Sequence, residues 1–106
     1  MEPVKRIDAL LSMLQAEPKD VFLNYSLALE YVAEKNFGLA EEQFLRVLNF
    51  QADYIPAFYQ LGKLYEQQLQ NQNALSIFKK GLELAKAQTN NKAINEFSEA
   101  IFMLED

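Results

Sequence analysis

The sequence predicts an all-α protein of about six helices arranged as antiparallel hairpins. Apolar residues recur at spacings of three and four through most of the 106 residues, without the sustained alternation that is typical of strands. Polar breaks divide the chain into six segments, each long enough for three or more helical turns; they lie at 17–19, 35–38, 51–53, 70–73 and 88–91. Because the connections between these segments are short, neighbouring helices are expected to run antiparallel.

The breaks also carry helix start signals. A side-chain oxygen just before a helix can accept a hydrogen bond from a free backbone amide of its first turn. The candidates for this role are Asp20, Asn36, Asp53, Asn71 and Thr89. Pro3 and Pro56 fall near two predicted first turns, where a missing amide hydrogen costs little.

The composition restricts the chemistry that is open to this chain. There is no cysteine and no histidine, so the thiolate nucleophile, the disulfide and the commonest general base and metal ligand are all absent. We therefore expect no enzyme and no cofactor. A hydrophobic content of 50% with only three Gly and three Pro predicts one ordered domain over 1–106.

Charge and the first residues restrict the partners and the location. The net charge of −5 would repel a phosphate backbone, so no nucleic acid is expected. Residues 1–15 contain charges and no unbroken apolar run, so we expect neither a signal peptide nor a membrane span. A cytoplasmic protein is the resulting prediction.

The sequence matches itself when it is shifted by 34 residues. The identities that result are Tyr25 with Tyr59, Leu27 with Leu61, Tyr31 with Tyr65, Ala40 with Ala74, Phe44 with Phe78 and Leu48 with Leu82. Small residues also coincide at Ala28 and Gly62. Small side chains are needed where two antiparallel helices approach closely, and aromatic side chains fill the space beside that contact. Each period is therefore predicted to be one helical hairpin.

This pattern resembles the tetratricopeptide repeat family. Residues 55–88 have its aromatic residue at Phe58, its Leu-Gly pair at 61–62 and its tyrosine at Tyr65, followed by Ala74 and Phe78. Residues 21–54 keep the spacing but have Asn24 in place of the large aromatic residue. A generic bundle of four to six helices is the alternative, and it would require no such recurrence.

The resemblance implies a right-handed stack of hairpins, an α-solenoid. Its first repeat would span 20–54 and its second 55–88. Residues 1–19 would resemble the second half of a preceding repeat, and 89–106 would form a C-terminal capping helix. Lys35 and Leu69 stand where the family usually has the glycine that ends the first helix, and Ala52 and Lys86 stand in place of the closing proline. The helices are therefore expected to follow the family more closely than the turns.

The resemblance also implies a non-catalytic module for protein interaction, an adaptor or scaffold. In this family the first helices of the repeats line a concave groove that binds an extended peptide or a partner helix. Transferred to this sequence, the groove positions form two rows: Phe22, Tyr25, Leu29 and Val32, then Pro56, Tyr59, Lys63 and Glu66. For the first row the alternative is ordinary burial, because the segment 20–35 is apolar nearly all round.

Some members of the family bind a terminal carboxylate of the partner with Lys, Asn and Arg. The matching positions here hold Tyr25, Leu29, Gln60, Asn90 and Ile94. No basic clamp is therefore predicted, and we expect the partner to be bound by apolar and aromatic contacts.

Self-association is the alternative function. Phe102 and Met103 lie beside the predicted capping face of the last helix, which carries Ile94, Phe97, Ile101 and Leu104. If the two were exposed they would mark a homodimer or partner interface, but burial of both by a folded-back helix is slightly favoured. A small enzyme or ligand carrier is the least favoured class. The paired carboxylates at Glu30 and Glu34, Glu41 and Glu42, and Glu96 and Glu99 are interpreted as solvated helix faces rather than catalytic acids or metal ligands.

Overall fold

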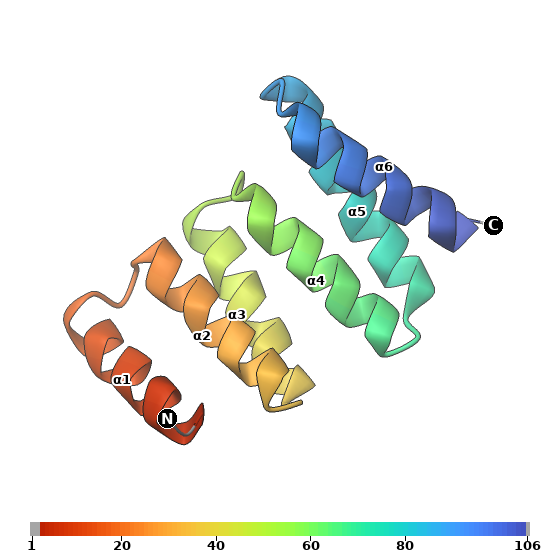
Figure 1. The fold of residues 1–106 in the computed structure, drawn as a ribbon. Coiled ribbons are helices and arrows are strands. Elements are labelled where there is room, and N and C mark those ends of the chain that lie inside the picture. Colours follow the sequence, from red (N-terminus) through yellow and green to blue (C-terminus); the bar gives the residue numbers. More distant parts are fainter. Residues whose placement is uncertain (1–2, 106) are drawn as a thin grey trace. The chain divides into compact units, whose positions relative to one another are not determined.

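The computed structural model describes residues 3–105, which form six α-helices and contain no strand (Figure 1). In chain order they are α1 (Pro3–Ala16), α2 (Val21–Ala33), α3 (Phe37–Phe50), α4 (Ile55–Gln67), α5 (Asn71–Ala87) and α6 (Asn91–Glu105). The predicted fold class and the predicted number of helices are confirmed. The chain divides into two compact units, Met1–Ala52 with α1 to α3 and Asp53–Asp106 with α4 to α6.

In the first unit α2 and α3 form an antiparallel hairpin, and α1 lies along α2 (Figure 1). The core comes from the facing sides of α2 and α3, and its buried apolar residues are Leu27, Ala28, Ala40, Phe44 and Val47. The ring of Tyr25 lies against that of Phe44, with 6.0 Å between ring centroids. The small and aromatic residues of the repeat thus form much of the hairpin core.

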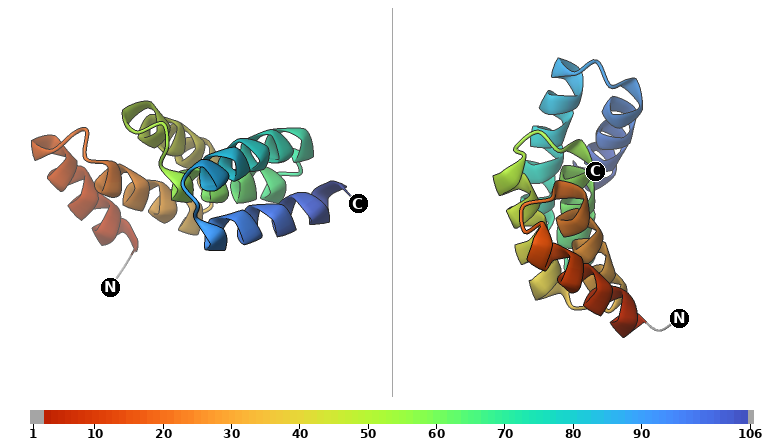
Figure 2. Two further views of the ribbon diagram at one scale, coloured as in Figure 1. Left: turned by 90° about the horizontal axis from the view of Figure 1, so that it is seen from above. Right: turned by 90° about the vertical axis from the view of Figure 1, so that its left-hand side faces the viewer.

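In the second unit α4 and α5 form an equivalent hairpin, and α6 runs along α5, as both views of Figure 2 show. Its core contains an aromatic cluster to which each helix contributes one ring. Tyr59 lies 6.0 Å from Phe78 and 5.8 Å from Phe97, and the last two are 6.3 Å apart, measured between centroids. All three pairs are tilted or edge to face, which is the favourable arrangement for aromatic rings.

Two glycines mark the closest helix approaches in this unit. A Cβ atom added to Gly62 would lie 2.2 Å from Cε1 of Phe78, and one added to Gly81 would lie 2.4 Å from Cζ of Phe97. The close approach predicted at Gly62 is confirmed, whereas Gly81 was not singled out from the sequence. Each glycine precedes its phenylalanine by sixteen residues, so the α5–α6 pair repeats the packing of the α4–α5 pair.

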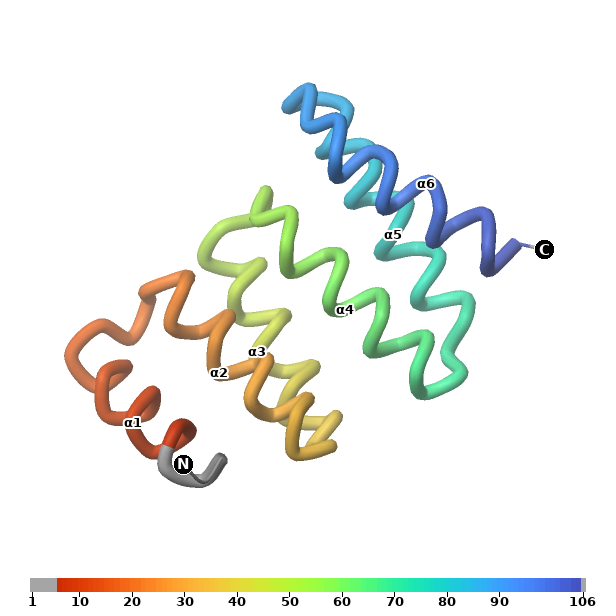
Figure 3. Tube along the Cα trace, viewed as in Figure 1, coloured from red at the N-terminus to blue at the C-terminus, as the bar shows by residue number. Residues whose placement is uncertain are grey.

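The turns α2–α3, α4–α5 and α5–α6 share one geometry (Figure 3). Their central residues have left-handed backbones, with φ of 61° at Lys35, 62° at Leu69 and 54° at Thr89. The next amide in each turn donates to a carbonyl oxygen five residues earlier, at 2.8 to 2.9 Å. These bonds close the helix end as a Schellman motif, which usually uses glycine. The turns therefore form without the family's glycine, at a cost of about 1 kcal/mol each.

Two of the five predicted caps are confirmed. The Asp20 carboxylate accepts from the amide of Leu23 at 2.8 Å, and the Asn36 side chain accepts from the amide of Leu39 at 3.4 Å. In addition, Pro56 occupies the first turn of α4.

The other three predicted caps, Asp53, Asn71 and Thr89, are wrong. Tyr54 and Gln70 occupy the cap positions of α4 and α5, and neither makes a side-chain capping bond. Because Thr89 is the left-handed residue of its turn, the capping bond shifts to Asn90, whose side-chain oxygen accepts from the amide of Ala93 at 3.1 Å. Polar residues thus mark where a helix starts to within one or two positions.

The glycine contacts generate a stability prediction with a matched control. Gly62→Ala and Gly81→Ala should each lower the free energy of unfolding by roughly 1–3 kcal/mol, because the new methyl group would overlap a buried phenylalanine ring. Gly38→Ala lies in α3 with nothing within 4 Å of the added Cβ, so it should raise stability by about 0.5–1 kcal/mol. Urea unfolding measures the free energy of unfolding of all three variants. If Gly38→Ala changed it by the same amount as the other two, the packing described here would be contradicted.

Candidate functional site

The first predicted row lies on α2. Phe22 is 66% exposed, whereas Tyr25, Leu29 and Val32 are half-buried. The Tyr25 ring is held in place by Phe44, which is itself fully buried. Burial of Phe22 under another helix does not occur, so the row presents a mostly apolar surface with one large exposed ring.

The second predicted row lies on α4 and is more polar. Tyr59 is half-buried against the aromatic cluster, and Pro56 is exposed. The ammonium group of Lys63 lies 5.9 Å from the centroid of the Tyr59 ring and 3.5 Å from Oε1 of Glu66. A fixed ring with a cation over its face can bind both apolar and anionic groups of a partner.

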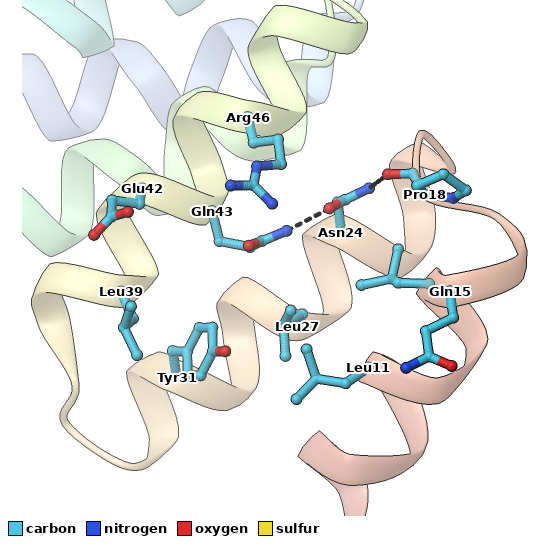
Figure 4. Close-up of a pocket in the computed structure, with 11 residues that line it drawn as sticks. Leu11, Gln15, Pro18, Asn24, Leu27, Tyr31, Leu39, Glu42, Gln43 and Arg46 are labelled. Carbon is cyan, nitrogen blue, oxygen red and sulfur yellow. Dashed lines mark hydrogen bonds between the residues drawn. The ribbon is translucent and has the colours of Figure 1, made fainter.

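A hollow of about 560 Å³ opens in the first unit, between α1, α2 and α3 (Figure 4). Sequence reasoning did not anticipate it. Its lining combines apolar and polar side chains and comprises Leu11, Leu14, Gln15, Pro18, Asn24, Leu27, Tyr31, Leu39, Glu42, Gln43 and Arg46. Since α2 supplies its floor and the other two helices its walls, the site depends on α1 as much as on the hairpin.

Two buried amide side chains lie in this hollow. Asn24 is 1% exposed and Gln43 is 6% exposed, and Nε2 of Gln43 donates to Oδ1 of Asn24. Nδ2 of Asn24 donates in turn to the carbonyl oxygens of Pro18 at 3.1 Å and Asp20 at 2.8 Å, which ties the preceding turn to α2. The sequence marked Asn24 as a departure from the repeat but gave no sign of its partner.

The last helix leaves two large apolar side chains in solvent. Phe102 is 73% exposed and Met103 is 67% exposed. The favoured interpretation, that a folded-back helix buries both, is therefore wrong. The reason is geometric: α6 turns Phe97 toward α5, and the side chains at 102 and 103 extend away from that contact.

Across the described residues, no group of three or more acidic side chains gathers as a metal site would require. Within the same range, no helix is long and apolar enough to cross a lipid bilayer.

Paired antiparallel helices with a recurrent small-residue contact define a helical repeat protein, and the structural comparisons agree. A tetratricopeptide repeat domain protein from Salinibacter ruber, solved in solution, has 31% identity and a TM-score of 0.78, over 83% of this chain and 89% of that one. A crystal structure of a tetratricopeptide repeat domain protein from the same organism has 30% identity and a TM-score of 0.75, over 81% and 97%. This chain belongs to the tetratricopeptide repeat family.

A more distant neighbour shows the fold alone. The TPR2B domain of yeast Sti1, solved in a complex with pHsp70, has a TM-score of 0.85 at 12% identity, over 93% of this chain and 79% of that one. No protein-family model and no curated protein matches the sequence. Fold and family together support a protein-interaction module in general.

The buried amide pair generates the second prediction. Gln43→Met keeps the length of the side chain but leaves Oδ1 of Asn24 buried without its donor, so the free energy of unfolding should fall by about 1–3 kcal/mol. Gln72→Met changes an exposed residue of α5 in the same way and should stay within about 0.5 kcal/mol of the unmodified protein. Chemical unfolding measures the stability of both variants. If Gln43→Met leaves the free energy of unfolding unchanged, the hydrogen bond between Gln43 and Asn24 does not contribute to stability.

Proposed function

We propose that this protein is a non-catalytic adaptor that binds a peptide or a partner helix through the exposed rows of its first helices. The row on α2 is Phe22, Tyr25, Leu29 and Val32, and the row on α4 is Tyr59, Lys63 and Glu66. These positions match those with which the family lines its binding groove. Each row is proposed as a contact surface in its own right.

The observation that carries the proposal is the fixed position of the two tyrosine rings. Tyr25 and Tyr59 both remain partly exposed while one side of each ring rests on a buried phenylalanine. Binding to a rigid aromatic surface loses little side-chain entropy, which is why such residues dominate interface energies. The Sti1 domain solved with pHsp70 has the same fold, and this supports a protein partner here.

The proposal predicts that surface changes in the rows weaken peptide binding without unfolding the protein. A displayed peptide library would be selected on the unmodified chain, and the best peptide titrated by calorimetry. If the peptide uses the row on α2, Phe22→Ser should weaken its binding by at least about tenfold; if it uses the row on α4, Lys63→Glu should do so, since each change removes or reverses an exposed contact group.

Leu45→Ser is the matched control, because Leu45 is an exposed apolar residue of α3, at 47%, outside both rows. Its affinity should stay within about twofold of the unmodified protein. Equal losses in all three variants, or none in the two row variants, would contradict binding through the rows.

We keep self-association as a second candidate function because of Phe102 and Met103. Phe102 and Met103 are large, apolar, exposed and adjacent in the sequence, and a contiguous exposed apolar patch typically marks an interaction surface. A homodimer would bury them against a second copy, most simply around a twofold axis.

Light scattering after size exclusion, over a wide range of protein concentration, tests this candidate. A dimer should convert to a monomer in the double variant Phe102→Ser, Met103→Ser, because its apolar contact is lost. Leu69→Ser, which removes a side chain that is 85% exposed in a turn, serves as the control and should leave the mass unchanged. A monomer at every concentration would remove the candidate.

A further inference from the structure

We infer that the hollow between α1, α2 and α3 is a second binding site, which takes a peptide segment with a leucine-sized side chain beside a carboxylate. It is separate from the rows proposed above. With about 100° of rotation per residue, Asn24, Leu27 and Tyr31 are centred roughly 130° around α2 from Tyr25, Leu29 and Val32. A partner in the hollow would therefore leave the row on α2 free.

The first argument is an unused hydrogen-bond acceptor. Gln43 is only 6% exposed. Its only hydrogen bond with the described residues is the one that its Nε2 donates to Oδ1 of Asn24. Its Oε1 accepts nothing from them. Among the described residues no fully buried side-chain oxygen or nitrogen lacks a partner, so this oxygen is not fully buried and meets solvent through the hollow that Gln43 lines. A carbonyl oxygen that faces an open space from a largely buried side chain can accept a hydrogen bond from an N–H group of a bound peptide.

The second argument is an unpaired guanidinium group at the rim. Arg46 forms no ion pair with any described residue, although Glu42 stands one helical turn away on the same helix. In Figure 4 Arg46 extends from α3 over the opening, beside the Asn24–Gln43 pair. A guanidinium group in this position can bind a carboxylate through two parallel hydrogen bonds.

The third argument is the apolar side of the hollow. Leu11 and Leu39 are 43% and 40% exposed, and Leu27 forms the floor between them. These three side chains come from α1, α3 and α2, so an aliphatic side chain placed among them would contact all three helices. Small molecules prefer enclosed pockets that bury most of their surface, and this open hollow would bury less of it. A peptide needs to insert only one side chain.

The test uses two acetylated and amidated tripeptides, Glu-Leu-Glu and Lys-Leu-Lys, titrated into the ¹⁵N-labelled protein. The side-chain amide signals of Gln43 and Asn24 should move with Glu-Leu-Glu and move less with Lys-Leu-Lys at equal concentration. Arg46→Glu should reverse this preference, because it leaves two carboxylates at the rim. Lys35→Glu makes the same charge change at an exposed residue outside the hollow and should preserve the preference.

A second pair of variants tests the apolar contact. Leu39→Ser should weaken Glu-Leu-Glu binding several-fold, whereas Leu45→Ser, on the same helix and similarly exposed, should not. Thermal unfolding of each variant establishes that the fold is retained.

Three results would overturn the inference: no movement of the Gln43 amide signal at any peptide concentration, equal affinity for both tripeptides, or equal effects of Leu39→Ser and Leu45→Ser. Movement confined to the backbone amides of Phe22, Tyr25, Leu29 and Val32 would also overturn it, and would at the same time support the row on α2. The two proposals can therefore fail independently.

Discussion

The close approach of paired helices is the constraint on which the rest of this structure depends. At Gly62 and Gly81 the facing phenylalanine ring occupies the space that a Cβ atom would need. Ala28 and Phe44 hold the corresponding positions of the first hairpin, and both are fully buried. Once these contacts fix the distance between helices, the neighbouring aromatic rings have one place to pack, and the faces of each helix that remain in solvent are determined as well.

The two hairpins use the same contact but differ in what lies beside it. In the second unit the positions 34 residues after Asn24 and Gln43 hold Phe58 and Ile77, and Phe58 is buried as an ordinary core residue. In the first unit the amide pair replaces this apolar packing with a hydrogen bond. The Asn24 side chain is smaller than that of Phe58, and its hydrogen bonds to the carbonyl oxygens of Pro18 and Asp20 tie the turn before α2. The hollow beside it has one polar side for the same reason.

This difference gives α2 two distinct surfaces. One side carries the exposed Phe22 and the partly exposed Tyr25, which rests on Phe44. The other side lines the hollow, to which α3 contributes the acceptor oxygen of Gln43 and, at the rim, the unpaired guanidinium group of Arg46. A thirteen-residue helix can serve both because its residues alternate between the two sides every few positions. Rigid hairpins hold both surfaces in place, which suits a protein whose role is to bind others.

The sequence by itself determined the helices, the hairpins and the family. The helices follow from the local periodicity of apolar residues, and the hairpins and the family follow from the recurrence of 34 residues. It also placed the close contact at Gly62 and the two candidate rows. Only the tertiary structure decided which of these residues face solvent, as Phe102 and Met103 show. The structure alone also showed the close contact at Gly81, the hydrogen bond between Asn24 and Gln43, and the hollow. Each depends on residues that are sixteen or more positions apart, and a single sequence does not show which distant side chains are in contact.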